Sequence, residues 1–173
     1  MLSDRVEQAS ESTSYQIEYS LTELYKDKLT NLLDEKRREV SHFQLCPLFK
    51  TPNKTVSQQL LGLCEKAKKG RSTGRTDFNH DSSRSHAFFQ FRIKSIELTS
   101  AGRVERMGSI LFADLAGSEK MSDSLTFDKE RRIETLSINK SLTSLRDVLT
   151  ALAQNQEHIP YRNSRLTMLL QPY

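Results

Sequence analysis

The sequence has 173 residues, 36% of them hydrophobic and 28% charged, which is enough for one globular domain with its own core. No apolar run approaches the roughly 18 residues of a membrane span, the polar start lacks the apolar stretch of a signal peptide, and the cysteines and histidines are not grouped as metal ligands. We therefore expect a cytoplasmic protein with no membrane partner, whose formal charge of +4 favours acidic partners.

The first part of the chain predicts a polar lead-in followed by a strand. Residues 1–13 are polar and aperiodic, and we expect them to be disordered. Residues 15–21 alternate between apolar and polar side chains, which is typical of a half-buried strand. Leucines at positions 24, 29, 32 and 33 stand among charges and suggest a short helical turn, and a short strand is a candidate at 42–45.

Residues 55–70 predict a helix with recognisable ends. Thr55 is followed three residues later by Gln58, which is the spacing of a capping box. Apolar side chains fall on one face and lysines gather near the carboxyl end. We expect Gly70 to end this helix in the left-handed conformation.

Two strands are predicted next, at 89–98 and 104–113, with a turn at 100–102 between them. The alternation of apolar and polar residues changes phase at Ser95, where we expect a strand end or a bulge. Residues 110–113 are continuously apolar, which predicts a strand that is covered on both faces.

A long helix is predicted at 129–153, and a short one at 164–171 after the break at Pro160. The long helix has an apolar stripe at spacings of three and four residues, made of Ile138, Leu142, Leu145, Leu149 and Leu152. The order strand, helix, strand, strand, helix, helix is typical of a three-layer α/β domain.

Two polar loops adjoin the predicted strands. The first, NHDSSRSH at 79–86, places a hydroxyl pair beside an arginine, an arrangement that can hold a metal-bound phosphate. The second, DLAGSE at 114–119, places an acid and then a glycine after an apolar strand, as in many NTPases. Taken singly, each loop is more often an ordinary turn.

Taken together, the two loops resemble switch I and switch II of the kinesin motor family. The tracts SLTELY (20–25), NLLD (31–34), INKSL (138–142) and IPYRNSRLT (159–167) resemble the same family, most closely the minus-end-directed kinesins with carboxy-terminal motors. The resemblance implies that residues 14–173 form part of a motor domain. It also implies a three-layer, P-loop NTPase-like α/β fold, with an incomplete central sheet and helices on both faces.

The resemblance implies that the cofactors are ATP and Mg²⁺. It gives catalytic roles to Ser83, Arg84, Gly117 and Glu119, with Arg84 and Glu119 forming the salt bridge that closes the two switches. It gives nucleotide contacts to Asn79, Ser82, Ser83, Asp114 and Gly117, and it places Ser83 and Asp114 near Mg²⁺, with Asp114 acting through water.

The resemblance also implies that one surface faces tubulin. The residues expected there are Asn139, Lys140, Tyr161, Arg162 and Arg165. The implied partners are microtubules and another kinesin or kinesin-like chain in a dimer, and the implied location is the microtubule cytoskeleton, with the spindle as one candidate. Nucleic acid is not expected, because the basic run at 66–75 has no aromatic residues among its cations.

The family's phosphate-binding loop, GxxxxGK[ST], has no match in this sequence. None of the six glycines is followed by lysine, so we expect these residues alone to bind ATP weakly or not at all. Two functions remain open: part of an ATP-driven microtubule motor, or a non-catalytic module that binds microtubules or forms a heterodimer. In either case the strand at 104–113 is expected to be an apolar sheet edge.

Overall fold

The computed structural model describes residues 13–48, 55–73, 84–117 and 129–173. In chain order the elements are β1 (Thr13–Tyr25), β2 (Lys28–Asn31), β3 (Cys46–Pro47), α2 (Val56–Thr73), β4 (His86–Thr99), β5 (Gly102–Asp114), α3 (Lys129–Ala153), η2 (Tyr161–Asn163) and α4 (Arg165–Leu170). Thr13, the last residue of the expected lead-in, already belongs to β1, and the rest of that segment lies outside the described residues. No described helix is long and apolar enough to cross a membrane.

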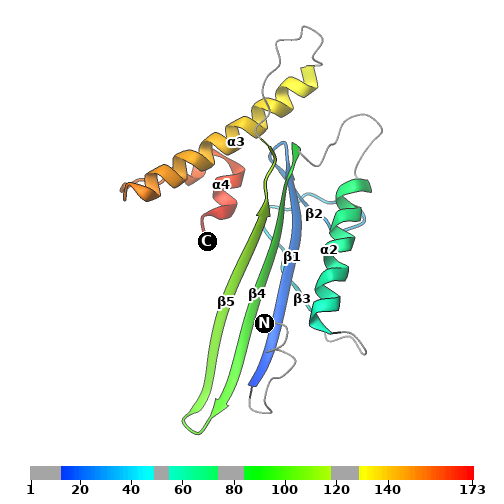
Figure 1. Ribbon diagram of the computed structural model, residues 1–173, viewed down its shortest axis with the longest axis vertical. Coiled ribbons are helices and arrows are strands. Elements are labelled where there is room, and N and C mark those ends of the chain that lie inside the picture. The colour runs from blue at the N-terminus through cyan, green and yellow to red at the C-terminus, as the bar shows by residue number, and fades with distance from the viewer. Residues whose placement is uncertain (1–12, 49–54, 74–83, 118–128) are drawn as a thin grey trace.

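One antiparallel sheet organises these elements, with strand order β2-β1-β4-β5 and β3 paired to β1. Phe88 packs in a core cluster with α4, whereas its neighbour Phe89 packs against the cluster that contains Ala67 of α2. Because successive side chains of a strand point to opposite faces, α2 and α4 cover opposite faces of the sheet (Figure 1). The predicted fold, an incomplete sheet with helices on both faces, is confirmed.

β5 forms one edge of the sheet, as expected, but its predicted burial is wrong. Ile110 and Phe112 are 43% and 58% exposed, and Leu111 is the strand's one half-buried residue. Leu111 packs against the cluster around α4, which reaches only that position of the apolar run. The composition of a strand therefore shows that it can be covered, whereas its neighbours decide whether it is.

A β-hairpin replaces the helical turn predicted around the first leucines. β1 continues to Tyr25, and Lys26 and Asp27 form a two-residue turn with φ values of 47° and 61°. This turn brings Leu24 opposite Leu29 in the register of β1 and β2. Positive φ at both central residues is the geometry of a tight hairpin turn, but asparagine and glycine are its usual sequence signal.

Helix α2 begins with the predicted capping box. The Thr55 amide donates to Gln58 Oε1 at 3.0 Å, and the Gln58 amide donates to Thr55 Oγ1 at 3.2 Å. The predicted cap at Gly70 is wrong, because the helix continues to Thr73. A Cβ at Gly70 would lie 2.5 Å from the Leu32 carbonyl oxygen, so the glycine permits a close approach of the chain after β2. The short strand expected at 42–45 forms instead at Cys46–Pro47.

The β4–β5 hairpin is longer and more regular than predicted. β4 passes Ser95 without a break, and Ser95 pairs with Tyr15 on one side and Arg106 on the other. Beyond Phe91 its residues are half-buried or exposed on both faces, so a change in the apolar phase costs little burial and does not end the strand. Gly102 closes the hairpin with a φ of 124°.

Helix α3 spans the predicted residues, but two of the five residues of its predicted apolar stripe are exposed. Ile138 is buried, whereas Leu149 and Leu152 are 57% and 45% exposed. The buried face is instead made of Glu134, Ile138, Ser141, Ser144, Val148 and Ala151. The carboxyl-terminal half of this face consists of small or short side chains, which allows η2 and α4 to pack closely against it.

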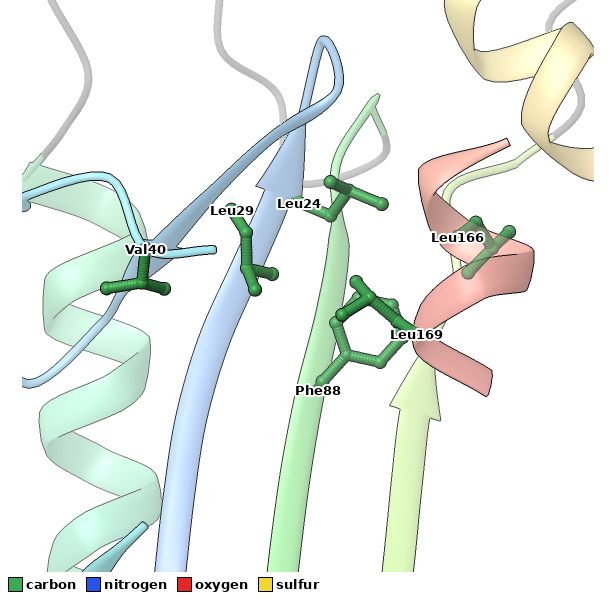
Figure 2. Packing of buried hydrophobic residues seen from close by; sticks show 6 residues of the cluster. All are labelled: Leu24, Leu29, Val40, Phe88, Leu166 and Leu169. Atoms are coloured by element: carbon green, nitrogen blue, oxygen red, sulfur yellow. The ribbon is translucent and has the colours of Figure 1, made fainter. Parts of the chain in front are cut away.

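The main core cluster connects α4 to the sheet. It contains Leu24, Leu29, Val40, Phe88, Leu166 and Leu169, as Figure 2 shows. Phe88 and Leu166 are fully buried, and the Phe88 ring lies 5.6 Å from that of Phe43, measured between centroids. Burial of one methylene group contributes roughly 0.8 kcal/mol. Burial of an aromatic and several leucines in one cluster contributes several times that amount to the packing of α4 against the sheet. The position of α4 is therefore determined by the core.

Candidate functional site at the ends of β4 and β5

The two predicted switch loops meet the sheet side by side. Ala87 at the start of β4 pairs with Asp114 at the end of β5, so the chain entering β4 lies next to the chain leaving β5. The structure brings Arg84, Asp114 and Gly117 to this end of the sheet. Asn79, Ser82, Ser83 and Glu119 lie outside the described residues, and their roles stay predictions.

Arg84 makes an ion pair with α3. Its Nη1 atom lies 3.2 Å from Glu134 Oε2, and the Glu134 side chain is only 4% exposed. The other carboxylate oxygen, Glu134 Oε1, is buried without a hydrogen-bond partner among the described residues. The predicted pair of Arg84 with Glu119 is untested. Glu134 was missed by sequence reasoning, although its spacing of four and seven residues from Ile138 and Ser141 places it on the same helix face.

Arg71, in the last turn of α2, bridges the two loops. Its Nη1 atom donates to Asp114 Oδ2 at 2.7 Å, and its Nη2 atom donates to the Ser85 carbonyl at 2.8 Å. Sequence reasoning treated Arg71 as part of a basic helix end, because a charge at that position gives no sign of its partner. The bridge connects α2 to the chain on both sides of the β4–β5 boundary.

Glu23 of β1 is the centre of a buried polar network beneath this bridge. Its side chain is 10% exposed and accepts a hydrogen bond from Ser85 Oγ at 2.7 Å. The Glu23 carboxylate also pairs with Arg37, which donates to the Gly70 carbonyl, and lies 3.6 Å from Arg71 Nε. Because buried charges are tolerated only when they are paired, this network couples β1, α2 and the entry to β4.

His86 is buried at the first residue of β4, with 4% of its surface exposed. Burial, assisted by the positive charge of Arg71, lowers its pKa to about 4, while Asp114 and Asp27 act in the opposite direction. Its two ring nitrogens contact the Ala116 amide and the Ser141 hydroxyl. The imidazole is therefore neutral at the pH of a cell.

The expected Mg²⁺–ATP contacts of Asp114 and Gly117 stay predictions. The Asp114 carboxylate, expected near the metal, is engaged by the Arg71 guanidinium, and Gly117 is exposed beside it. Within the ranges that the structure describes, no group of three or more histidine, cysteine or acidic side chains could hold a metal ion.

The cations expected to face tubulin gather around one cavity of about 650 Å³. Lys140 comes from α3, Arg162 from η2 and Arg165 from the start of α4. A capping box orients α4: the Thr167 amide donates to Ser164 Oγ at 3.1 Å, and the Ser164 amide donates to Thr167 Oγ1 at 3.2 Å. Asn139 and Tyr161, the other two predicted residues, are half-buried nearby on α3 and η2.

The segment around residues 39–41 also lines this cavity, which the sequence did not indicate. Arg165 donates to the Ser41 carbonyl, and the carboxylates of Glu39 and Asp27 lie on the cavity wall. These residues are more than 120 positions from Arg165 in the chain, and no local pattern predicts such a contact.

A family model described as the kinesin motor domain matches residues 1–173. Kinesin-like protein KIN-13B of Arabidopsis thaliana is 38% identical over 90% of this chain and 24% of its own length. Kinesin-like protein KIN-14M of the same plant is 36% identical over 94% of this chain and 24% of its own length. The chain thus spans about a quarter of these relatives.

Solved structures agree with this similarity. A microtubule-bound KIF14 dimer aligns over 97% of this chain and 51% of its own, with a TM-score of 0.77 and 26% identity. The carboxy-terminal motor and motor homology domain of Kar3Vik1, fused to a synthetic heterodimeric coiled coil, aligns over 98% of this chain and 46% of its own, with a TM-score of 0.74 and 26% identity.

Proposed function

This chain belongs to the kinesin motor domain family, and from that premise we propose that it forms the phosphate-sensing and microtubule-contacting part of an ATP-driven microtubule motor. The observation that carries the proposal is the convergence of Lys140, Arg162 and Arg165 around one cavity. These three cations come from three separate elements, so the tertiary structure, and not a local run of charge, assembles the surface.

The chemistry of this surface suits an acidic protein partner. Exposed cations on a rigid surface attract carboxylates, and the attraction weakens as salt screens it. The microtubule in the KIF14 complex is a partner of that structural relative, and we extend it to this chain because the corresponding fold presents basic side chains here. The same proposal implies that the chain associates with the microtubule cytoskeleton in the cytoplasm. The spindle is the more specific location that we propose.

The proposal also includes a phosphate-sensing role for the junction of the two switch loops. Arg84, Asp114 and Gly117 lie at neighbouring strand ends, where they suit the detection of a γ-phosphate. ATP, when bound with Mg²⁺, would supply that phosphate to the family's motor. Because the sequence has no GxxxxGK[ST] tract to hold the α- and β-phosphates, we expect these 173 residues alone to show no micromolar ATP binding in isothermal titration.

Microtubule co-sedimentation at low and high ionic strength tests the proposal. A Lys140→Ala/Arg162→Ala/Arg165→Ala variant should lose roughly tenfold in affinity at low salt, since three exposed charge pairs contribute about 0.5 kcal/mol each. A matched variant, Lys66→Ala/Lys68→Ala/Arg103→Ala, removes the same charge from α2 and β5 and should bind as the original chain does. Binding that is indifferent to salt, or equal losses in the two variants, would contradict the proposed surface.

A second function is a non-catalytic microtubule-binding or heterodimerising module. It is favoured by the absence of a GxxxxGK[ST] tract in this sequence and by the similarity to the structure that contains a motor homology domain. The two functions separate in one measurement. Microtubule-stimulated ATP hydrolysis by the chain supports the motor, whereas binding without hydrolysis, with or without a second kinesin-like chain, supports the module.

A further inference from the structure

His86 lies where three parts of the chain meet: the start of β4, the loop that leaves β5, and the buried face of α3. The Ala116 amide donates to His86 Nδ1 at 3.1 Å. His86 Nε2 lies 3.0 Å from Ser141 Oγ, which itself donates to the Ile138 carbonyl at 2.7 Å. All of these groups are buried or within a helix, so water does not easily replace any of them.

These contacts fix both the tautomer and the charge of the ring. Nδ1 accepts from an amide, so it carries no proton, and the single proton of the neutral ring lies on Nε2. The Ser141 hydroxyl uses its own hydrogen on the Ile138 carbonyl, so it must accept from Nε2. The hydrogen bonds therefore run in one direction, from the Ala116 amide through the ring to the backbone of α3.

The two ends of this chain of hydrogen bonds have different expected roles. Ala116 immediately precedes Gly117, the residue expected to sense the γ-phosphate. Ser141 immediately follows Lys140, which is exposed on the cavity proposed to face the microtubule. The ring also stays neutral well below the pH of a cell, because its burial and the charge of Arg71 outweigh the effects of Asp114 and Asp27.

We propose that His86 is a positioning residue that ties the Ala116–Gly117 backbone to α3, so that a displacement of α3 moves the start of the second switch loop. The expectation that α3 is displaced rests on the proposed function, whereas the hydrogen-bonded connection between α3 and the Ala116–Gly117 backbone does not. In this role His86 acts through the Ala116 amide and the Ser141 hydroxyl.

Two serine variants test the tie without microtubules. Ser141→Ala removes the acceptor of Nε2, and Ser144→Ala removes a similarly buried hydroxyl of α3 that bonds the Lys140 carbonyl and has no contact with His86. Amide hydrogen exchange of the intact chain should show Ala116 exchanging about three to ten times faster in Ser141→Ala, from the loss of one hydrogen bond, and unchanged in Ser144→Ala. Equal effects of the two variants would overturn the proposal.

A spectroscopic measurement and a second variant keep the proposal testable if Ser141→Ala does not fold. Nitrogen NMR of His86 should show the neutral tautomer with the proton on Nε2, and a proton on Nδ1 would exclude the proposed direction. In His86→Asn the side-chain oxygen can still accept from Ala116 but cannot reach Ser141, so adding Ser141→Ala should leave Ala116 exchange unchanged. A further acceleration in that background would show that Ser141 acts by another route.

The final arm adds microtubules. Their addition should change the exchange of Ala116 and Gly117 in the original chain and in Ser144→Ala, and this response should be lost in Ser141→Ala while co-sedimentation is retained. A retained response would overturn the transmission. If no variant co-sediments, the proposed function is wrong, and the serine pair still decides whether α3 positions Ala116.

Discussion

The two ends of the central sheet differ in almost every physical respect. At the end that carries the switch loops, Glu23, Ser85 and His86 are at most 8% exposed and every one of them is hydrogen-bonded to a distant part of the chain. At the far end of the β4–β5 hairpin, ion pairs such as Lys94–Glu105 and Arg106–Glu97 lie largely in solvent. Both ends contain many charged side chains, but only at the end with the switch loops do buried hydrogen bonds hold such side chains in place.

The difference shows that the value of a polar contact in this molecule depends on burial. The Glu23 carboxylate is surrounded by several donors and is largely shielded from water, whereas a carboxylate on the hairpin can exchange its partner for water. We therefore expect substitutions of the same chemical kind to have large effects at one end and small effects at the other.

The largest contrast should come from two phenylalanines. Phe88→Ala empties a fully buried position between the sheet and α4 and should lower the free energy of unfolding by about 4–5 kcal/mol. Phe112→Ala, on the exposed edge strand, should cost less than about 1 kcal/mol in the isolated chain. Urea denaturation of both variants checks this, and similar losses would mean that the β5 edge is covered in solution.

The next contrast compares two glutamates. Glu23→Gln removes the carboxylate charge that pairs with Arg37 and lies 3.6 Å from Arg71 Nε, and it should cost about 3–5 kcal/mol, because it breaks a largely buried ion pair from one side. Glu105→Gln, on the hairpin, should leave the urea midpoint unchanged. A small loss in Glu23→Gln would show that water enters the junction.

The loss of folding stability at acidic pH should depend on the protonation of His86. Because its pKa is lowered to about 4 in the folded chain, against about 6.5 when unfolded, the unfolded chain takes up a proton first as the pH falls. Stability from this group is present above about pH 6.5 and is lost between about pH 6.5 and pH 4, by up to about 3 kcal/mol. Urea titrations across this range should show a flatter pH dependence for His86→Gln than for the original chain.

The smallest contrast concerns the partners of Arg84. Glu134→Gln should cost about 1–3 kcal/mol, because it weakens a charged hydrogen bond inside the molecule. Glu119→Ala is predicted to change stability by less than about 1 kcal/mol, as for an exposed ion pair. Thermal melts of the two variants rank the partners, and a larger loss in Glu119→Ala would make Glu119 the principal one.

Several features whose residues lie close together in sequence were predicted correctly. The bounds of α3 and the Thr55–Gln58 capping box depend on spacings of three and four residues that recur within one element. The hairpin at Lys26–Asp27 was missed because the residues that adopt positive φ there are not the usual ones. Arg84, Asp114 and Gly117 were singled out because their loops resemble a family pattern, and their roles stay predictions.

The sequence by itself therefore determined the family and most of the main elements. Only the tertiary structure decided that β5 is exposed, that Leu149 and Leu152 face solvent, and that Lys140 and Arg165 share a cavity with residues 39–41. It also decided the partners of Glu23, Arg71 and His86, whose bonds span between 14 and 62 positions of the chain. The physical reason is that the burial and the pairing of a side chain depend on the segments that surround it in space. Those segments are far away in the sequence, so no periodic pattern of residues identifies them.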